Sequence, residues 1–197
     1  MMIDFLTKSK IRKKIILLFL YNQKKEFYLS EIAKIVDTSP GTAQRELNRL
    51  LAGDFITFKK KANLSIYSLN KRYTLLKEVE AIVDKTFGIE VMLKNGLGTI
   101  DNIDYAFIFG SFVKGQFRSE SDIDLFIIGD IEEDRILNVV QRIENSIARE
   151  INYHLADRDG FLSKAKDSHF YREILRDSLL LVGDKDEFEK LIEKAHS

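Results

Sequence analysis

The chain has 197 residues, enough for one large domain or two small ones. Its 45% of apolar residues supports hydrophobic cores, and 31% of charged residues is ordinary for a water-exposed surface. The absence of cysteine excludes disulfides, thiol nucleophiles and cysteine-based zinc sites. No apolar run reaches about 18 residues, and the apolar stretch near the N-terminus has helical spacing and no small-residue cleavage site. We therefore expect a cytoplasmic protein without a membrane partner.

The two halves of the chain carry opposite charge. Residues 1–75 contain 15 Lys and Arg against 6 Asp and Glu, a net charge of +9, whereas residues 76–197 contain 16 against 25, a net charge of −9. Such a division predicts a basic nucleic-acid-binding module joined to a different, acidic module. The alternative interpretation is chance clustering of charges on solvated faces.

The basic half begins with three predicted helices. Apolar spacing indicates a helix over 11–20 and a short helix over 30–36, for which Ser30 is a suitable N-cap. A third helix is predicted over 39–52, with Ser39 as its N-cap and an apolar stripe at i, i+4, i+7 and i+8. Two strand-like runs, 55–58 and 64–69, follow, and the segment between them is predicted to be a connecting loop with three lysines.

This order of elements resembles a winged helix-turn-helix of the MarR/ArsR-like kind. The resemblance implies double-stranded DNA as a partner, since a recognition helix fills the major groove and a cationic wing neutralises phosphates. The residues predicted to bind DNA lie on the exposed face of the third helix and at the hairpin tip: Thr42, Gln44, Arg45, Asn48, Arg49, Lys59, Lys60 and Lys61. The alternative is that Arg45 and Arg49 are only surface charges and the hairpin only a basic loop.

A further helical stripe over 75–87 ends at Gly88 and joins the two halves. In winged-helix regulators such a helix often pairs two subunits, so we expect a homodimer. Packing of the same apolar face within one chain is the alternative.

The acidic half contains a two-part motif between two predicted strands. The apolar run 105–109 leads directly into Gly110 and Ser111, and a polar return leads to Asp122 and Asp124 at the start of a second apolar run. Because side chains alternate along a strand, the two carboxylates point to the same side. Paired carboxylates suit Mg²⁺, and a glycine allows close approach of a phosphate to the backbone. The motif therefore predicts a site for Mg²⁺ and a triphosphate.

Gly110-Ser111-Phe112-Val113-Lys114-Gly115, followed by Ser121-Asp122-Ile123-Asp124-Leu125, resembles the minimal (MNT-like) nucleotidyltransferases of the DNA polymerase β superfamily. The resemblance implies that Asp122 and Asp124 hold Mg²⁺. It also implies transfer of NMP from an NTP to a hydroxyl acceptor, which in some minimal nucleotidyltransferases is a partner toxin protein. The residues it places around the nucleotide are Gly110, Ser111, Lys114 and Ser121.

Active members of this superfamily use a third carboxylate on a neighbouring strand, and the matching position here is Asn152. An amide can offer an oxygen to Mg²⁺, but it carries no charge and is no general base. Alternation along the strand puts Glu150 and His154 on the same face as Asn152, so either could replace the third carboxylate from a position displaced by two residues along the strand. The expected catalytic residues are Asp122, Asp124, Asn152 and Glu150.

The predicted fold class is α+β: an N-terminal winged helix-turn-helix over 1–72, a linking helical segment over 73–96, and a small α/β nucleotidyltransferase domain with a mixed sheet over 97–197. The run 179–182 is predicted to complete that sheet. The predicted function is that of a DNA-binding protein with a Mg²⁺-dependent nucleotidyltransferase domain. The alternative is a transcriptional regulator whose second domain is catalytically weak or inactive and senses a nucleotide or binds a partner.

Overall fold

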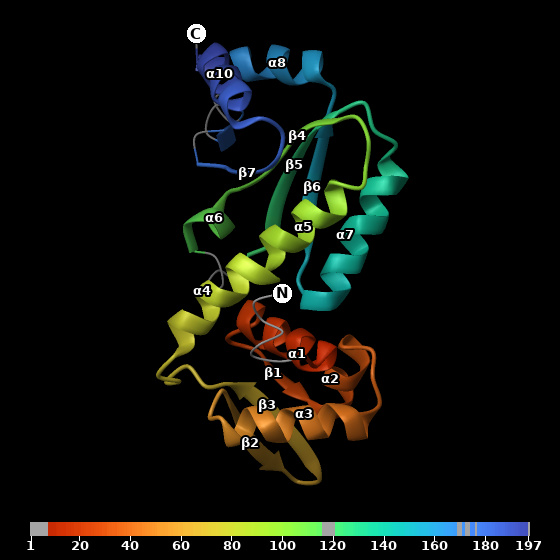
Figure 1. Ribbon diagram of the computed structural model, residues 1–197, viewed down its shortest axis with the longest axis vertical. Coiled ribbons are helices and arrows are strands. Elements are labelled where there is room, and N and C mark those ends of the chain that lie inside the picture. The colour runs from red at the N-terminus through yellow and green to blue at the C-terminus, as the bar shows by residue number, and fades with distance from the viewer. Residues whose placement is uncertain (1–7, 116–120, 169–170, 172–173, 176, 197) are drawn as a thin grey trace. The chain divides into compact units, whose positions relative to one another are not determined.

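The computed structural model describes residues 8–115, 121–168, 171, 174–175 and 177–196 (Figure 1). The chain forms two compact units, which are described separately. The first comprises Met1–Gly88 with Asn145–Ala148, and the second comprises Ile89–Glu144 with Arg149–Ser197. The division falls at Gly88, inside the segment that we expected to link two domains.

The first unit begins with a group of helices around an apolar core: α1 (Lys10–Tyr21), α2 (Leu29–Ile35) and α3 (Pro40–Ala52). The predicted cap of the third helix is confirmed, because the Ser39 hydroxyl accepts from the Thr42 N–H at 3.2 Å. The predicted cap of the second is wrong. That helix begins at Leu29, and the Glu31 carboxylate accepts from the backbone N–H of Tyr28 at 2.7 Å.

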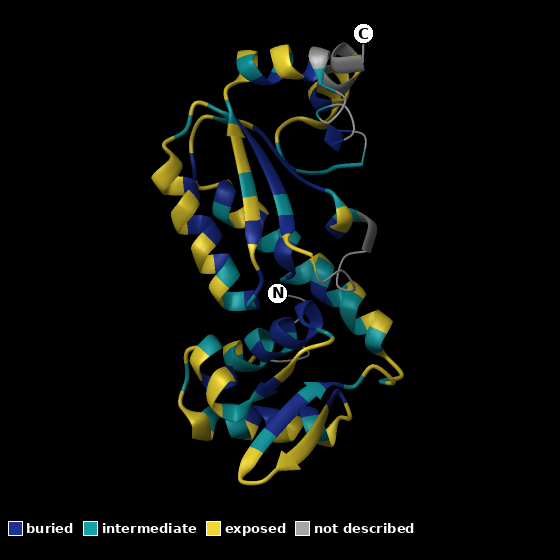
Figure 2. Cartoon of the chain, turned by 180° about the vertical axis from the view of Figure 1, so that it is seen from behind, coloured by how far each residue is buried: buried dark blue, intermediate teal, exposed yellow. Residues whose placement is uncertain are grey.

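A three-stranded antiparallel sheet completes this core, in the order β1-β3-β2. Its strands are β1 (Glu26–Tyr28), β2 (Ile56–Lys61) and β3 (Leu64–Leu69). Strand β1 was not predicted. The predicted loop over 59–63 is also wrong: Lys59, Lys60 and Lys61 pair with β3, and only Ala62 and Asn63 form the turn. The lysines therefore lie along an edge strand that is exposed for most of its length (Figure 2).

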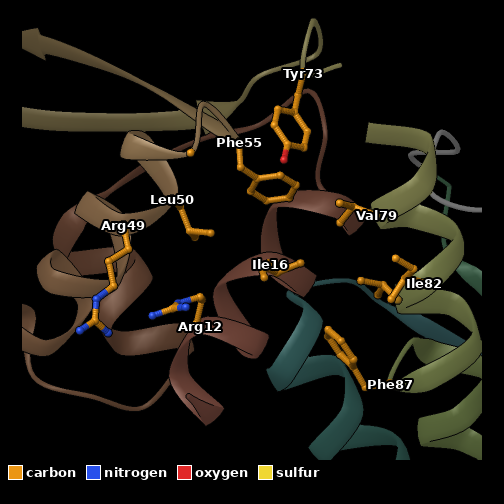
Figure 3. A pocket seen from close by; sticks show the side chains of 11 residues that line it. Arg12, Ile16, Arg49, Leu50, Phe55, Tyr73, Val79, Ile82 and Phe87 are labelled. Carbon is orange, nitrogen blue, oxygen red and sulfur yellow. The ribbon is translucent and has the colours of Figure 1, made fainter. Parts of the chain in front are cut away.

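Helix α4 (Leu76–Thr86) belongs to the first unit. The Gln23 amide donates to the Glu80 carboxylate at 2.7 Å, which ties α4 to the end of α1. Val79, Ile82 and Val83 face a cavity within the same unit (Figure 3). The apolar side of α4 is thus directed at its own chain, as in the second of the two sequence-based alternatives, and the homodimer stays a prediction.

The second unit is built on a mixed sheet, as predicted, and the four strands of this sheet lie in the order β6-β5-β4-β7. The strands are β4 (Ile103–Phe109), β5 (Ile123–Gly129), β6 (Ile151–Ala156) and β7 (Leu179–Val182). Strands β5 and β6 run parallel because α7 (Glu133–Ile147) returns the chain between them, and the other two pairs are antiparallel. The central strands β4 and β5 are buried over most of their length (Figure 2).

Helices cover both faces of this sheet. On one face lie α5 (Ile89–Leu97) and α7 (Figure 1), packed so closely that a Cβ atom at Gly96 would be 2.6 Å from Val139 Cγ1. On the other face, an aromatic cluster with Phe107 and Phe126 packs against Phe161 of α8 (Arg158–Asp167) and Phe188 of α10 (Lys185–His196). The short helix α6 (Ser111–Gly115) follows β4.

Candidate active site and nucleic-acid interface

Two aspartates stand at the beginning of β5. Asp122 directly precedes the strand and is exposed, whereas Asp124 is its second residue and is half-buried. Because strand side chains alternate, both project to the side of the sheet that carries Phe126. The buried residues Ile123 and Leu125 anchor the strand from the opposite side. Two carboxylates therefore lie at the N-terminal end of β5, and the buried apolar residues of the strand fix the position of both.

Asn152 lies beside this pair on β6. The parallel register sets Asn152 opposite Asp124, and the Asn152 amide nitrogen donates to Asp122 Oδ2 at 3.3 Å. Two carboxylates and one amide thus converge at one edge of the sheet. Within the described part of the chain, no group of three or more His, Cys, Asp and Glu side chains could hold a metal ion.

The turn after β4 closes the site from the other side. Phe109 pairs with Asp124 in the antiparallel register, so the following Gly110 lies directly against the Asp124 carboxylate. Gly110 has φ +76°, and a Cβ atom there would be only 2.7 Å from Asp124 Oδ2. Glycine satisfies both the left-handed backbone and the close approach.

Hydroxyl groups border this turn. Ser111 begins α6, and its hydroxyl is hydrogen-bonded to the hydroxyl of Ser121 across the segment that separates them in the sequence. The expected phosphate-binding residues Gly110, Ser111 and Ser121 are therefore brought together near Asp122 and Asp124. The side chain of Lys114, the fourth such residue, lies outside the described part of the structure.

The pKa of the Asp124 carboxyl is raised above its ordinary value of 3.8. Burial is the main cause, and the negative charge of Asp122 acts in the same direction. A hydrogen bond from Asn152 and the charge of His154 act in the opposite direction but do not cancel the rise. A bound cation would relieve this penalty on the charged form.

Arg149 supports the site and was not identified from the sequence. It is buried, its guanidinium donates to the backbone carbonyl of Ser121, and it lies over the ring of Phe112 at 5.8 Å from the centroid. It therefore holds the backbone just before Asp122. In the sequence, a single arginine between a helix and a strand looks like an ordinary surface charge. Only its tertiary contact with the Ser121 carbonyl shows that it supports the site.

Glu150 and His154, the two proposed substitutes for a third carboxylate, and the nearby Asp157 have different surroundings. Glu150 is exposed just before β6, and its backbone carbonyl accepts from the Ile123 N–H at 3.0 Å. His154 stacks on Phe126, with 5.8 Å between the ring centroids. Asp157 caps α8 by accepting from the Gly160 N–H at 2.7 Å. Of these three, Glu150 is the one whose side chain has no such structural role in the described residues.

In the first unit, α3 carries the residues that we expected to read DNA. Arg45, Asn48 and Arg49 are exposed, whereas Thr42 and Gln44 are half-buried. Gln44 hydrogen-bonds to the Tyr67 hydroxyl at 2.9 Å and donates to Asn48 at 2.8 Å, and Thr42 accepts from Arg45 at 3.2 Å. Arg49 is paired with Glu46 at 2.9 Å, whereas in the described residues Arg45 has only the hydrogen bond to the Thr42 hydroxyl.

The lysines of β2 form a separate basic strip. Lys59 is paired with Glu26 at 3.1 Å, and Lys60 and Lys61 are exposed further toward the turn. Alternation along the strand points Lys60 away from the side that carries Lys59 and Lys61.

Comparison with known proteins shows which family the sequence of the second unit resembles. The family described as "Polymerase beta, Nucleotidyltransferase" matches residues 91–187. A Methanocaldococcus jannaschii protein named "Putative protein adenylyltransferase MJ0604" is 30% identical over 74 residues, which cover 38% of this chain and 73% of the relative. The chain belongs to the polymerase β nucleotidyltransferase family. Every nucleotidyltransferase-family residue discussed above, from Gly110 to Asn152, lies inside the matched range.

Solved structures that resemble the chain include a toxin-antitoxin crystallised with AMP-PNP (TM-score 0.41, 17% identity, 55% of this chain and 84% of that chain). AF1382 of Archaeoglobus fulgidus has a TM-score of 0.36 at 13% identity, covering 45% of this chain and 99% of that chain. A mutant of Lactococcus lactis ZitR has a TM-score of 0.35 at 16% identity, covering 47% and 63%. Scores this low do not establish a shared fold. In the described residues of this nucleotidyltransferase-family chain, every helix is too short or too polar to cross a bilayer.

Proposed function

We propose that the second unit is a Mg²⁺-dependent nucleotidyltransferase that transfers NMP from an NTP to a hydroxyl acceptor. The observation that carries the proposal is the close approach of the Asp124 carboxylate to the Gly110 turn, with Asp122 two residues earlier and hydrogen-bonded to Asn152. Carboxylate oxygens lie there beside a backbone that an anionic group can approach closely. Family membership supports the same reaction class.

The donor set fits Mg²⁺. This ion is usually bound by one or two carboxylates together with substrate phosphates, and Asp122 and Asp124 supply such a pair. The raised pKa of Asp124 fits a carboxyl whose charged form a bound cation would stabilise. When bound, Mg²⁺ neutralises charge on the phosphoryl oxygens and orients an in-line displacement.

The chain's own residues have defined tasks in this reaction. The Gly110 backbone and the Ser111 and Ser121 hydroxyls would bind the terminal phosphates, with Lys114 as a further basic group. The acceptor hydroxyl oxygen forms a bond to the α-phosphorus while the bond from that phosphorus to the pyrophosphate oxygen breaks. The Asn152 amide accepts no proton, so we assign the hydroxyl proton to the Glu150 carboxylate or to water.

The name of the M. jannaschii relative suggests the substrates. A protein adenylyltransferase moves AMP from ATP to a protein side chain. We therefore propose ATP as the NTP and a protein hydroxyl as the acceptor.

Asn152 favours a second candidate function. An amide at the position of the third carboxylate leaves the site with two negative charges and no general base at that position of β6. The second candidate is therefore a transcriptional regulator whose nucleotidyltransferase-like unit binds a nucleotide without turning it over.

One experiment separates the two functions. The full chain is incubated with Mg²⁺, each α-³²P-labelled NTP and a lysate, and labelled protein is followed on a gel. Transfer from ATP that is lost in Asp122→Asn/Asp124→Asn but kept in Asp130→Asn supports the enzyme. Asp130 is a matched control because it is exposed just past the opposite end of the same strand. Nucleotide binding without transfer supports the regulator, and the absence of both contradicts the proposed site.

We propose further that residues 1–72 form a winged helix-turn-helix that binds double-stranded DNA. Three helices followed by a hairpin, a third strand beside it and the net charge of +9 over residues 1–75 support this assignment. Arg45 would contact base edges, and Lys60 and Lys61 would contact phosphates.

A further inference from the structure

His154 lies beside the carboxylates of the candidate site, on the same side of the sheet. It follows Asn152 by two residues on β6, about 7 Å along the strand, and alternation directs both side chains to the side that carries Phe126. The charge of His154 acts on the Asp124 carboxyl, so the imidazole borders the site. The proposed reaction gives this residue no task.

The imidazole of His154 forms the outer end of a group of aromatic rings. It stacks on Phe126, with 5.8 Å between the centroids and 22° between the planes. Its centroid lies 6.0 Å from that of Phe109. Both phenylalanines are buried, whereas His154 is exposed. A flat ring that is supported from within the protein is therefore accessible to a ligand next to the carboxylates.

Three neighbouring strands divide the candidate site in the same order as the parts of an NTP (Figure 1). Gly110, which we assign to the terminal phosphates, follows β4. Asp122 and Asp124, which we assign to the metal ion at the α-phosphate, stand at the beginning of β5. Strand β6 continues this order at the edge of the sheet. Because the nucleoside is bonded to the α-phosphate and not to the terminal phosphates, we place it on the β6 side.

The acceptor and the nucleobase would both use this side, and β6 offers each a separate place. Glu150, the candidate proton acceptor, comes before Asn152 in the chain, whereas His154 comes after it. The acceptor hydroxyl would therefore lie toward the beginning of the strand and the nucleobase toward its end.

We propose that the nucleobase of the bound NTP stacks on the imidazole of His154, and that this contact makes the site prefer purine nucleotides. Stacking on an aromatic ring tolerates every base, but a purine covers more of the ring than a pyrimidine does. The contact with Phe126 fixes the plane of the imidazole, so the side chain loses little freedom when the base binds. The stacking rests on the proposed nucleotide site, whether or not the bound nucleotide is then transferred.

The test measures binding to the full chain, with Mg²⁺, by titration calorimetry. The ligands are the α,β-methylene analogues of ATP and UTP, which cannot be turned over, and inorganic tripolyphosphate, which reports the phosphate and metal part of the site alone. We expect the ATP analogue to bind more tightly than the UTP analogue. His154→Ala should weaken the ATP analogue about tenfold and leave tripolyphosphate unchanged. His154→Phe keeps a flat ring and should retain the affinity of the wild type.

Leu155→Ala is the matched control, because Leu155 is the next residue of the same strand, is exposed and points to the opposite side of the sheet. It should leave all three affinities unchanged. Equal binding of the ATP analogue by the wild type and His154→Ala would overturn the proposal. So would an equal loss of tripolyphosphate affinity, because the histidine would then act on the phosphates or on the strand.

The comparison of the two analogues needs no variant, so it decides the matter even if His154→Ala does not fold. Equal affinity of the wild type for both would contradict the purine preference. The absence of binding of tripolyphosphate and of both analogues would instead overturn the proposed nucleotide site, and the stacking with it. Tripolyphosphate binding that is lost in Asp122→Asn/Asp124→Asn would support that site independently of His154.

Discussion

The Asn152 amide donates to the Asp122 carboxylate at 3.3 Å across the parallel strands β5 and β6. A neutral donor therefore occupies the position from which a third acid would repel the first two. This hydrogen bond satisfies one carboxylate oxygen and joins the beginnings of two neighbouring strands. An amide here spares the folded chain a repulsion among three carboxylates, and it would offer the proposed Mg²⁺ one negative charge fewer.

Asn152→Asp should reverse this balance. Without Mg²⁺ the third negative charge should lower the free energy of unfolding by about 1 kcal/mol, because like charges meet at one strand edge. Millimolar Mg²⁺ should restore the loss and raise the rate of NMP transfer at least about tenfold, since a carboxylate can accept the acceptor's proton. Thermal unfolding with and without Mg²⁺ and the labelled-NTP assay measure the two effects. An unchanged melting temperature in both conditions would contradict the assignment of Asn152 to the site.

Gly110→Ala should damage the site more than its size suggests. The Cβ atom of the alanine would lie 2.7 Å from Asp124 Oδ2. The alanine would also have to keep φ at +76°, and this left-handed conformation alone costs about 1–2 kcal/mol. We expect a lower melting temperature and loss of Mg²⁺-dependent stabilisation. Gly41→Ala is the control, because a Cβ atom there would meet nothing within 4 Å and α3 would gain a better helix former. Equal effects of the two substitutions would argue against the close contact.

Asp124→Asn should stabilise the metal-free chain near neutral pH. The pKa of Asp124 is raised in the folded chain, so between the ordinary pKa of 3.8 and the raised pKa the folded state binds more protons than the unfolded state. The wild type therefore loses stability as the pH rises through this interval. The advantage of the variant should therefore be present at pH 7 and vanish near pH 3. Melting temperatures across this range measure it. A variant that is less stable than the wild type at pH 7 would show that Asp124 is held by stronger hydrogen bonds than we describe.

The basic strip on β2 should contribute to DNA affinity without sequence preference. Lys60→Gln/Lys61→Gln should reduce the slope of log K against log salt by about 2, because each lost phosphate contact removes about 0.9. Lys24→Gln/Lys25→Gln removes the same charge from the α1–β1 turn and should leave the slope nearly unchanged. Gel shifts on a duplex selected from a random pool provide the measurement.

Arg45→Ala should instead relax discrimination between sites. A base contact of this kind is worth about 1–3 kcal/mol, so the selected duplex should lose its advantage over a scrambled one. If the wild-type chain binds no duplex at all, or if Arg45→Ala weakens every duplex equally, the recognition-helix assignment of α3 is wrong.

The centre of the candidate site could be predicted because strand alternation and a glycine turn are local patterns. The pairing of β5 with its neighbour β4 is enough to bring Asp124 and Asp122 close to Gly110. The register of β5 with β6 then brings Asn152 beside the two aspartates. The contribution of Arg149 could not be predicted, because it depends on a carbonyl 28 residues away in the sequence.

Errors in the first unit have related causes. Strand β1 has three residues, too few to show alternation, and it exists because β3 pairs with it. The lysines looked like a loop by composition, yet cross-strand pairing extends β2 through Lys61. Ser30 was a plausible cap by residue type, but the Glu31 carboxylate satisfies the N–H of Tyr28, and the helix starts one residue earlier.

The position of Lys59, Lys60 and Lys61 on the outer strand of a small sheet has a consequence for solubility. An uncovered strand edge is a template on which another chain can add a strand, and a row of ammonium groups opposes that addition by repulsion and hydration. The same strip that we assign to phosphates would therefore also protect the protein from aggregation. Replacing all three lysines by apolar residues would leave an edge strand that promotes aggregation. The DNA-binding test therefore replaces only two of them, and by glutamine.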